Sequence, residues 1–196
     1  MKMIRIRRFV LLIALAVCTV SALAQQTVFQ LDPAQSTVEF TLRDVLHTVH
    51  GTFKMKDSAV RFDPTTGFAS GALVVDATSG NSGNSSRDKK MNKDILESAK
   101  YPEFRFTPQT IHGNIPASGA SQVQMTGIMN LHGGDHVLTV TAPVQVSNGR
   151  VTADVHFVVP YVEWGLKDPS TFILRVQKKV DIIVHAVGIL VPAGPK

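Results

Sequence analysis

Cysteine is almost absent from this chain of 196 residues. The single cysteine, Cys18, lies in the N-terminal segment, so no thiol remains beyond it. A chain without thiols cannot be held by disulfides, cannot ligate zinc through cysteine and cannot use a cysteine nucleophile. These three classes of protein are therefore excluded for the part of the chain that follows the N-terminal segment.

The N-terminal segment has the composition of an export signal. Four Lys and Arg side chains are followed by an unbroken apolar run over residues 9–18 and by Ala22-Leu23-Ala24. This is the order of regions in a secretory signal peptide with an Ala-x-Ala cleavage site. We therefore expect residues 1–24 to be removed after Ala24, and residues 25–196 to form one domain in the periplasm or in the medium.

A long apolar run and an excess of positive charge are both lacking downstream. The run at residues 9–18 is shorter than the about 20 residues of a membrane span, and no second run follows, so we expect no integral membrane span. Residues 25–196 hold 16 Lys and Arg against 15 Asp and Glu, so the net charge gives no electrostatic support for an anionic membrane as partner, and we expect no nucleic-acid partner. This near-neutral charge and exposed strand edges would allow a homodimer.

Signatures of common enzyme classes are missing as well. The sequence has no nucleophile elbow, P-loop, His-Glu-x-x-His motif or dinucleotide fingerprint. We therefore predict that the protein is not an enzyme and needs no cofactor. The alternative is an enzyme that acts on a lipid-like substrate, with Asp44, His112 or Glu163 as its titratable group.

Seven histidines raise a second alternative, a metal-binding stress protein. His132 and His136 flank residues 133–135, a Gly-Gly-Asp sequence typical of a hairpin turn, so we interpret them as exposed residues beside a turn. His47 and His50 would point to opposite faces of a strand. The sequence therefore predicts no metal site, since one would need His132, His136 and a further ligand to converge.

The sequence is rich in alternating apolar and polar residues, which predict strands with one buried face. Val38, Phe40 and Leu42 alternate with polar residues, and turn sequences such as Asn148-Gly149 separate the later runs. About eight antiparallel strands follow from the pattern, as a closed barrel or as a sandwich. The further runs cover residues 49–55, 60–62, 104–106, 123–131, 138–146, 151–157, 172–176 and 180–191.

One segment interrupts the strands. Residues 79–86 are a loop rich in Gly, Ser and Asn, and residues 87–100 carry apolar side chains at helical spacing. Ser85 and Asp88 predict a capping box, and Tyr101-Pro102 ends the predicted helix.

Several segments resemble the YceI-like family of exported lipid-binding proteins, in the same order and over nearly the whole of residues 25–196. They include residues 31–40 (LDPAQSTVEF), 49–53 (VHGTF), 100–106 (KYPEFRF) and 126–133 (TGIMNLHG). The resemblance implies an all-β fold, an eight-stranded antiparallel lipocalin-like barrel with one helical insertion near one end. It also implies an apolar tunnel that holds an isoprenoid or quinone-like chain.

The resemblance leads us to predict non-enzymatic binding, carriage or sequestration of an isoprenoid or other amphiphilic lipid outside the cytoplasm. A packed barrel whose outer surface recruits a protein partner is a further alternative, because a barrel of this size can fill its interior or hold one small ligand. The predicted lipid-binding residues are Phe40, Leu42, Val49, Phe53, Met91, Leu96, Phe104, Phe106, Met125, Met129, Phe157, Trp164 and Phe172.

Overall fold

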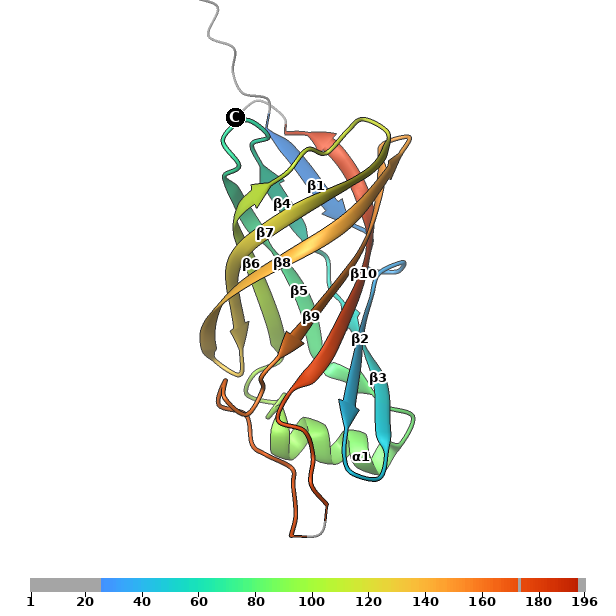
Figure 1. Cartoon of the computed structure of the whole chain (residues 1–196), viewed down its shortest axis with the longest axis vertical. Coiled ribbons are helices and arrows are strands. Elements are labelled where there is room, and N and C mark those ends of the chain that lie inside the picture. The colour runs from blue at the N-terminus through green and yellow to red at the C-terminus, as the bar shows by residue number, and fades with distance from the viewer. Residues whose placement is uncertain (1–25, 173, 194–196) are drawn as a thin grey trace, which may run out of the picture.

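A computed structural model describes residues 26–172 and 174–193, and the predicted signal peptide lies outside these described residues. Their strands form one antiparallel sheet that closes on itself as a barrel (Figure 1). The strands are β1 Thr27–Leu31, β2 Thr37–Arg43, β3 Thr48–Met55, β4 Ala59–Phe62, β5 Ala69–Asn81, β6 Glu103–His112, β7 Gly119–Leu131, β8 Gly134–Ser147, β9 Arg150–Val159 and β10 Val180–Pro192.

The barrel has eight strands at each level, although ten are distinguished along the described chain. Six long strands, β5 to β10, run through most of its height. Between β10 and β5 the ring is completed by β1 and β4 at the end that carries the C-terminus, here called the upper end, and by β2 and β3 at the lower end (Figure 1). The predicted eight-stranded antiparallel barrel is confirmed.

Two buried serines bridge the breaks between these short strands. Ser36, between β1 and β2, accepts a hydrogen bond from the backbone N–H of Val187 at 2.9 Å and donates to the carbonyl of Asp32 at 2.8 Å. Ser58, between β3 and β4, accepts from the N–H of Val74 at 3.0 Å and donates to the carbonyl of Lys56. Each hydroxyl thus satisfies backbone groups where the ladder is interrupted.

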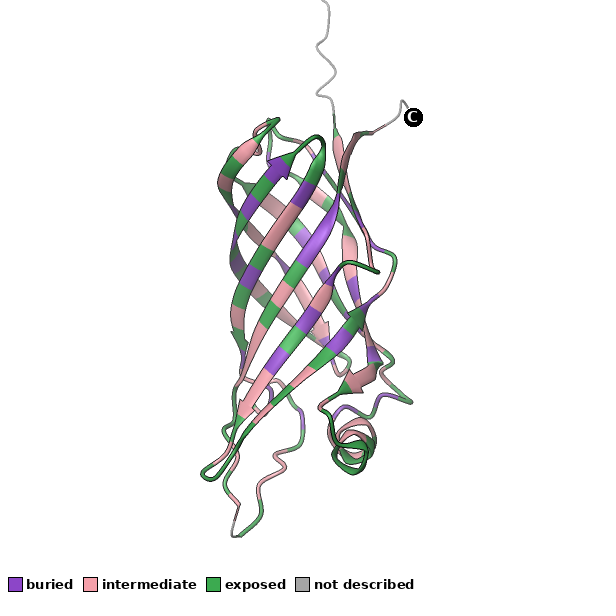
Figure 2. Cartoon of the chain, turned by 90° about the vertical axis from the view of Figure 1, so that its right-hand side faces the viewer, coloured by how far each residue is buried: buried purple, intermediate pink, exposed green. Residues whose placement is uncertain are grey.

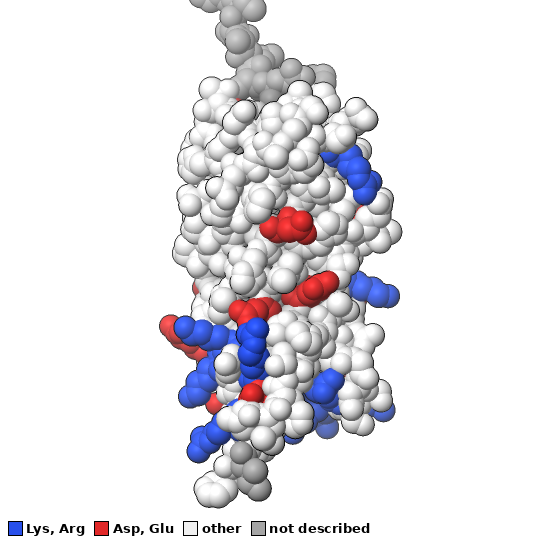
Figure 3. Space-filling model, turned by 45° about the vertical axis from the view of Figure 1, so that its right-hand side comes forward, with Lys and Arg blue, Asp and Glu red and all other residues white. Residues whose placement is uncertain are grey.

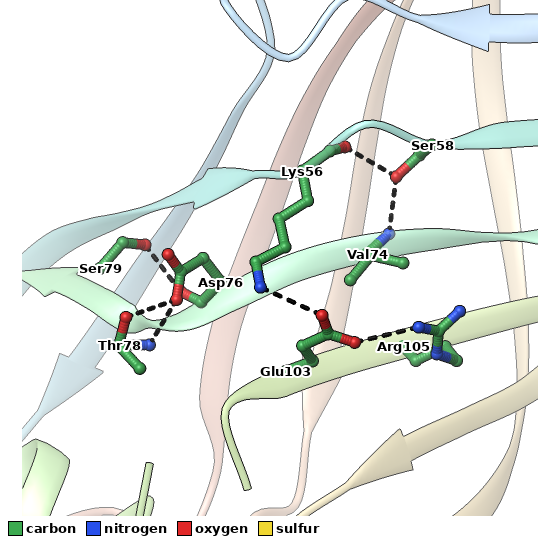
Figure 4. A network of polar contacts seen from close by, with 8 residues as sticks. All are labelled: Lys56, Ser58, Val74, Asp76, Thr78, Ser79, Glu103 and Arg105. Carbon is green, nitrogen blue, oxygen red and sulfur yellow. Dashed lines mark hydrogen bonds and ion pairs between the residues drawn. The ribbon is translucent and has the colours of Figure 1, made fainter. Parts of the chain in front are cut away.

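The polar side chains around the second break continue over the outer face of β3, β5 and β6 (Figure 4). Glu103 lies between Lys56 and Arg105, with 3.0 Å to a nitrogen of each. The hydrogen bond from Lys56, followed by that from Arg105, holds the pKa of Glu103 below its usual value. Asp76 accepts hydrogen bonds from the backbone and hydroxyl of Thr78, and the latter lowers its pKa. The Lys56–Glu103 pair thus links the segment after β3 to β6 across β5, which pairs with both strands.

Burial alternates along the strands as the sequence predicts (Figure 2). In β8, Val140, Ala142, Val144 and Val146 are buried while the residues between them are exposed. The same pattern in β2, β3, β6, β7 and β9 turns the predicted apolar runs toward the interior. The predicted Asn148-Gly149 hairpin is also confirmed, because both residues have the positive φ of a type I′ turn and connect β8 to β9.

Two strand predictions differ from the structure. Residues 69–81 form the long strand β5, which the sequence did not predict as an alternating run. The predicted strand at residues 172–176 is wrong, because its described residues, 172 and 174–176, lie in the β9–β10 loop and form a single isolated bridge, between Val176 and Asp44.

The predicted helix exists but is shorter. It consists of α1, Ser85–Lys90, and a π-helical turn η1, Met91–Ile95, which lie across the lower end of the barrel (Figure 1). The predicted capping box is wrong: the N-cap is Asn84, whose side chain accepts from the N–H groups of Ser86 and Arg87. Within the described residues no helix has the length and apolarity needed to span a bilayer.

Candidate ligand-binding cavity

The interior of the barrel contains two apolar cavities. The larger, of about 340 Å³, lies toward the lower end, and the smaller, of about 130 Å³, lies toward the upper end. We call them the lower chamber and the upper chamber. The volume of the lower chamber falls within the range of roughly 300–1,000 Å³ found for small-molecule sites.

The two chambers meet at a ring of shared residues, here called the waist. These residues line both cavities, so the lower chamber leads toward the upper one. Every residue that lines the upper chamber is apolar. The waist residues are Val75, Phe104, Met129, Phe157 and Val184.

Aromatic contacts shape the wall between the lower chamber and the waist. Phe53 lies between Phe40 and Phe104, with ring centroids 5.3 Å and 5.5 Å away. Phe40 lies over Gly51 of the neighbouring strand, and a Cβ on Gly51 would come within 2.4 Å of the ring of Phe40. The absence of a side chain at residue 51 therefore gives Phe40 its place in the wall.

Eleven of the thirteen predicted lipid-binding residues line a chamber. This is a finding about geometry, and contact with a lipid stays a prediction. Phe40, Leu42, Val49, Phe53, Met91 and Leu96 line the lower chamber, Phe106 and Met125 line the upper chamber, and Phe104, Met129 and Phe157 line both.

Trp164 and Phe172 do not line either chamber, so their predicted place in the cavity is wrong. The indole of Trp164 stacks on the ring of His136, with centroids 4.2 Å apart and planes 2° from parallel. Phe172 is 95 % exposed in the β9–β10 loop. Both residues belong to the long β9–β10 loop. The alternation of Phe172, Leu174 and Val176 predicted a strand that does not form, so the sequence pattern did not show which way these side chains point.

Sequence reasoning missed lining residues on β5 and β10. Val75 and Val184 belong to the waist, but β5 was not predicted, and the apolar stretch of β10 is too continuous to reveal its inward face. It also missed the β9–β10 loop, whose Leu166, Leu174 and Val176 line the lower chamber.

The polar lining residues mark the mouth of the lower chamber. Arg87 and Lys90 line the chamber and are exposed on the helix. The guanidinium of Arg87 donates to the hydroxyl and carbonyl oxygens of Ser82, each at 2.7 Å, and Asp88 accepts from the N–H of Ser82 at 2.9 Å. These bonds fix the helix against the end of β5, beside the opening.

The carboxylate of Asp44, on the opposite side of the mouth, is hydrogen-bonded within its own loop. It accepts from the backbone N–H groups of Leu46 at 2.7 Å and His47 at 2.6 Å. The hydrogen bond from Leu46 is the main cause that lowers the pKa of Asp44. The other two titratable candidates, His112 and Glu163, are exposed and line neither chamber. The three groups of the enzymatic alternative are therefore not brought together.

Tyr161 anchors the β9–β10 loop beside the lower chamber. Its hydroxyl donates to the carbonyl of Gln177 at 2.9 Å, which ties the beginning of the loop to its end. Burial, followed by the nearby charge of Asp168, raises the pKa of Tyr161 to about 12. A hydrogen bond from Ser170 lowers the pKa of Asp168.

The histidines beside the β7–β8 turn are not the exposed pair that we expected. His132 is half-buried, lies 2.6 Å from a carboxylate oxygen of Glu97 and packs on Tyr101. His136 points inward along β8, where its Nε2 is buried without a hydrogen-bond partner. Within residues 26–172 and 174–193, no group of three His, Cys, Asp or Glu side chains is arranged to hold a metal ion.

Solved structures with the same architecture come from several bacteria. BcnA of Burkholderia cenocepacia matches with a TM-score of 0.63 and 21% identity, over 81% of this chain and 99% of that chain. A polyisoprenoid-binding domain from Saccharophagus degradans, implicated in plant cell wall breakdown, matches with a TM-score of 0.62 and 18% identity, over 82% and 98%. The YceI protein of Campylobacter jejuni matches with a TM-score of 0.59 and 17% identity, over 76% and 88%.

Sequence comparison agrees with the structural likeness. UPF0312 proteins of Pseudomonas savastanoi and Pseudomonas syringae are 30% identical over 128 residues, which is 64% of this chain and 62% of theirs. The family model of the YceI-like domain matches residues 29–187, a range that includes the helix and every residue that lines the two chambers except Leu190. The chain therefore belongs to the YceI-like family.

Proposed function

We propose that the barrel binds one isoprenoid or other amphiphilic lipid, with its hydrocarbon chain in the two chambers and its polar end at the lower mouth. The observation that carries this proposal is the apolar lining, which continues through the waist from one chamber to the other. The polyisoprenoid-binding domain from Saccharophagus degradans, which shares the fold, supports the choice of ligand class.

The hydrophobic effect supplies the binding energy. Burial of a CH₂ group contributes about 0.8 kcal/mol, which corresponds to about fourfold in affinity for each added carbon. An apolar cavity of roughly 150 Å³ stays dry, so a chain that enters the upper chamber displaces no bound water there. Affinity should therefore depend more on the length of the chain than on its headgroup.

The proposed role is carriage or sequestration of the lipid without chemical change. The placement of Asp44, His112 and Glu163 favours this view over the enzymatic alternative, since only Asp44 lines a chamber. Its lowered pKa keeps the carboxylate ionised near neutral pH, which disfavours a role as a general acid.

A charge placed at the waist tests the proposal. Met129→Glu puts a carboxylate on the wall shared by both chambers, and an unpaired charge in an apolar site is strongly unfavourable. Uptake of a fluorescent isoprenoid should be lost, while Gln124→Glu, which adds the same charge on the exposed face of the same strand, should bind normally. Circular dichroism establishes that both variants are folded. Normal uptake by folded Met129→Glu would rule out the chambers as the binding site.

The proposed site of action is outside the cytoplasm, either the periplasm or the medium. Support comes from the signal-like composition of residues 1–24. The intact mass of protein recovered after export should correspond to a chain that begins at Gln25. A full-length mass in the exported fraction would contradict cleavage after Ala24.

Self-association stays a prediction. The described sheet closes through the pairings of β5 with β6 and of β1 with β10. However, β8 and β9 pair only over residues 144–147 and 150–153, so the lower part of each of these two strands keeps an unpaired edge. Sedimentation velocity at increasing concentration measures whether a dimer forms.

A further inference from the structure

Charge is distributed unevenly between the two ends of the barrel. Residues 43–50, 85–96 and 161–180, which surround the lower mouth, contain nine Lys and Arg against five Asp and Glu. The remaining described residues contain six against ten. In the face shown by Figure 3, Lys and Arg accordingly gather around the lower end. The near-neutral total therefore conceals a cationic end.

Most of these cations face solvent without a counter-ion. The Lys and Arg side chains of residues 85–96 and 161–180 are exposed. Of the nine, only Arg43 forms an ion pair with another described residue, Asp181. Lys178 and Lys179 are adjacent and exposed just before β10.

Three large apolar side chains are exposed in the same region. Val45 and Leu46, in the β2–β3 loop, are 64 % and 70 % exposed, and Phe172, in the β9–β10 loop, is 95 % exposed. The two loops are joined, because the N–H of Val45 donates to the carbonyl of Arg175 at 3.2 Å. A second bond runs from the N–H of Gln177 to the carbonyl of Arg43 at 2.9 Å. The three apolar side chains thus belong to one connected surface.

We propose that this surface docks on an anionic lipid bilayer. We call it the basic tip, and define it as Val45, Leu46 and Phe172 together with the Lys and Arg side chains of residues 85–96 and 161–180. Exposed apolar side chains surrounded by cations are the combination that peripheral proteins use: the apolar groups enter the interface and the cations attract anionic headgroups. Apart from Arg87, whose guanidinium donates to Ser82, none of these Lys and Arg side chains forms a side-chain hydrogen bond or an ion pair with another described residue.

The basic tip overlaps the residues that line the lower chamber, so docking would bring the mouth of this chamber to the bilayer. Arg87 and Lys90 belong to it and also line the lower chamber, and Leu174 and Val176 line that chamber from the same loop as Phe172. A docked barrel therefore presents its mouth to the bilayer, so that a hydrocarbon chain passes between membrane and chamber with little exposure to water. This consequence rests on the proposed lipid binding, whereas docking itself does not.

Vesicle binding tests docking directly. Cleaved protein is sedimented with vesicles of phosphatidylcholine, or of phosphatidylcholine mixed with an equal amount of phosphatidylglycerol. We expect binding to the anionic vesicles only, weakened by salt. Lys178→Gln combined with Lys179→Gln should weaken it about 30-fold, from roughly fivefold per cation. Lys54→Gln combined with Arg61→Gln removes two exposed cations outside the basic tip and should change binding little.

A matched pair of phenylalanines tests the apolar part. Phe172→Ser should weaken vesicle binding about tenfold, as expected for loss of a partly inserted ring. Phe68→Ser, which removes a 72 % exposed ring from the connection between β4 and β5 at the upper end, should have no effect. Equal effects of the two substitutions, equal effects of the two double substitutions, or no binding of the wild type to anionic vesicles would overturn the proposal. Uptake of an isoprenoid from detergent micelles, measured in parallel, keeps the proposed lipid binding separate, because it needs the chambers but not the basic tip.

Discussion

The ring of Phe53 meets the ring of Phe104 edge-on, with centroids 5.5 Å apart and planes at 80°. Phe53 lines only the lower chamber, whereas Phe104 lines both. Edge-to-face pairs of this kind are favourable beyond the area that they bury. The pair therefore fixes a boundary that divides the interior into a wide lower part and a narrow upper part.

The length of the bound chain should depend on the upper chamber. Ala153 lines only this chamber, and Ala153→Leu should fill part of its volume of about 130 Å³. We expect short-chain alcohols to bind as before, whereas the gain of about fourfold per CH₂ should end at a shorter chain length than in the wild type. Titration of a homologous series by calorimetry measures this.

The control for this experiment is the next residue along β9. Thr152→Leu adds a similar side chain at the position of opposite parity, which faces away from the interior. An unchanged length limit in folded Ala153→Leu would show that the ligand chain does not reach the upper chamber.

Ser36 should stabilise the fold without affecting ligand binding. In Ser36→Ala the buried N–H of Val187 loses its partner, which costs about 1–3 kcal/mol of unfolding free energy. Urea denaturation measures the loss, with Ser70→Ala, on an exposed position of β5, as the control. Equal stability of the Ser36→Ala variant and the wild type would mean that water or another group replaces the hydroxyl.

Gly51→Ala should destabilise the wall of the lower chamber. The new Cβ would lie 2.4 Å from the ring of Phe40 and 2.6 Å from the carbonyl oxygen of Asn81, so a ring and a backbone segment must both shift. We expect a loss of about 1–3 kcal/mol in unfolding free energy and weaker lipid binding. Thr52→Ala, at the next and exposed position of β3, should do neither. Full stability and affinity of Gly51→Ala would contradict the tight contact with Phe40.

Stability at alkaline pH should depend on Tyr161. Its pKa is raised to about 12 by burial, against about 10 in the unfolded chain. The folded state therefore favours the neutral phenol, and the resulting stability is fully present below about pH 10 and is lost as the pH rises toward 12. Urea unfolding between these pH values should show the decline in the wild type and a weaker decline in Tyr161→Phe. Identical profiles would contradict the raised pKa.

Local pattern was sufficient to predict most strands. Val38 and Phe40 of β2 alternate with polar neighbours because one face of the strand is buried. An alternation of apolar and polar residues with a period of two indicates such a half-buried strand. Closure of the barrel, by contrast, depends on pairing between β1 and β10, at the two ends of the described chain. Such pairing leaves no trace in either strand alone, and only the resemblance to the YceI-like family predicted the barrel.

The errors in the side-chain direction of Trp164 and Phe172 and in the end of the helix have the same physical cause. Trp164 and Phe172 lie in a loop whose course depends on contacts such as that of Tyr161 with Gln177, so the alternation over residues 172–176 did not indicate the direction of their side chains. The predicted helix over residues 87–100 is shorter because it ends at Leu96, after the π-helical turn η1, and Met91 and Leu96 line the lower chamber. Both features result from tertiary packing, which a single sequence does not encode locally.

The most direct test of the account is native mass spectrometry of the protein recovered after export, followed by extraction of whatever it carries. The account predicts one lipid per barrel, with a long hydrocarbon chain, which is released by organic solvent and is absent from the Met129→Glu variant. A bare polypeptide that also takes up no added isoprenoid would contradict it, and would mean that the two chambers are gaps in a filled core.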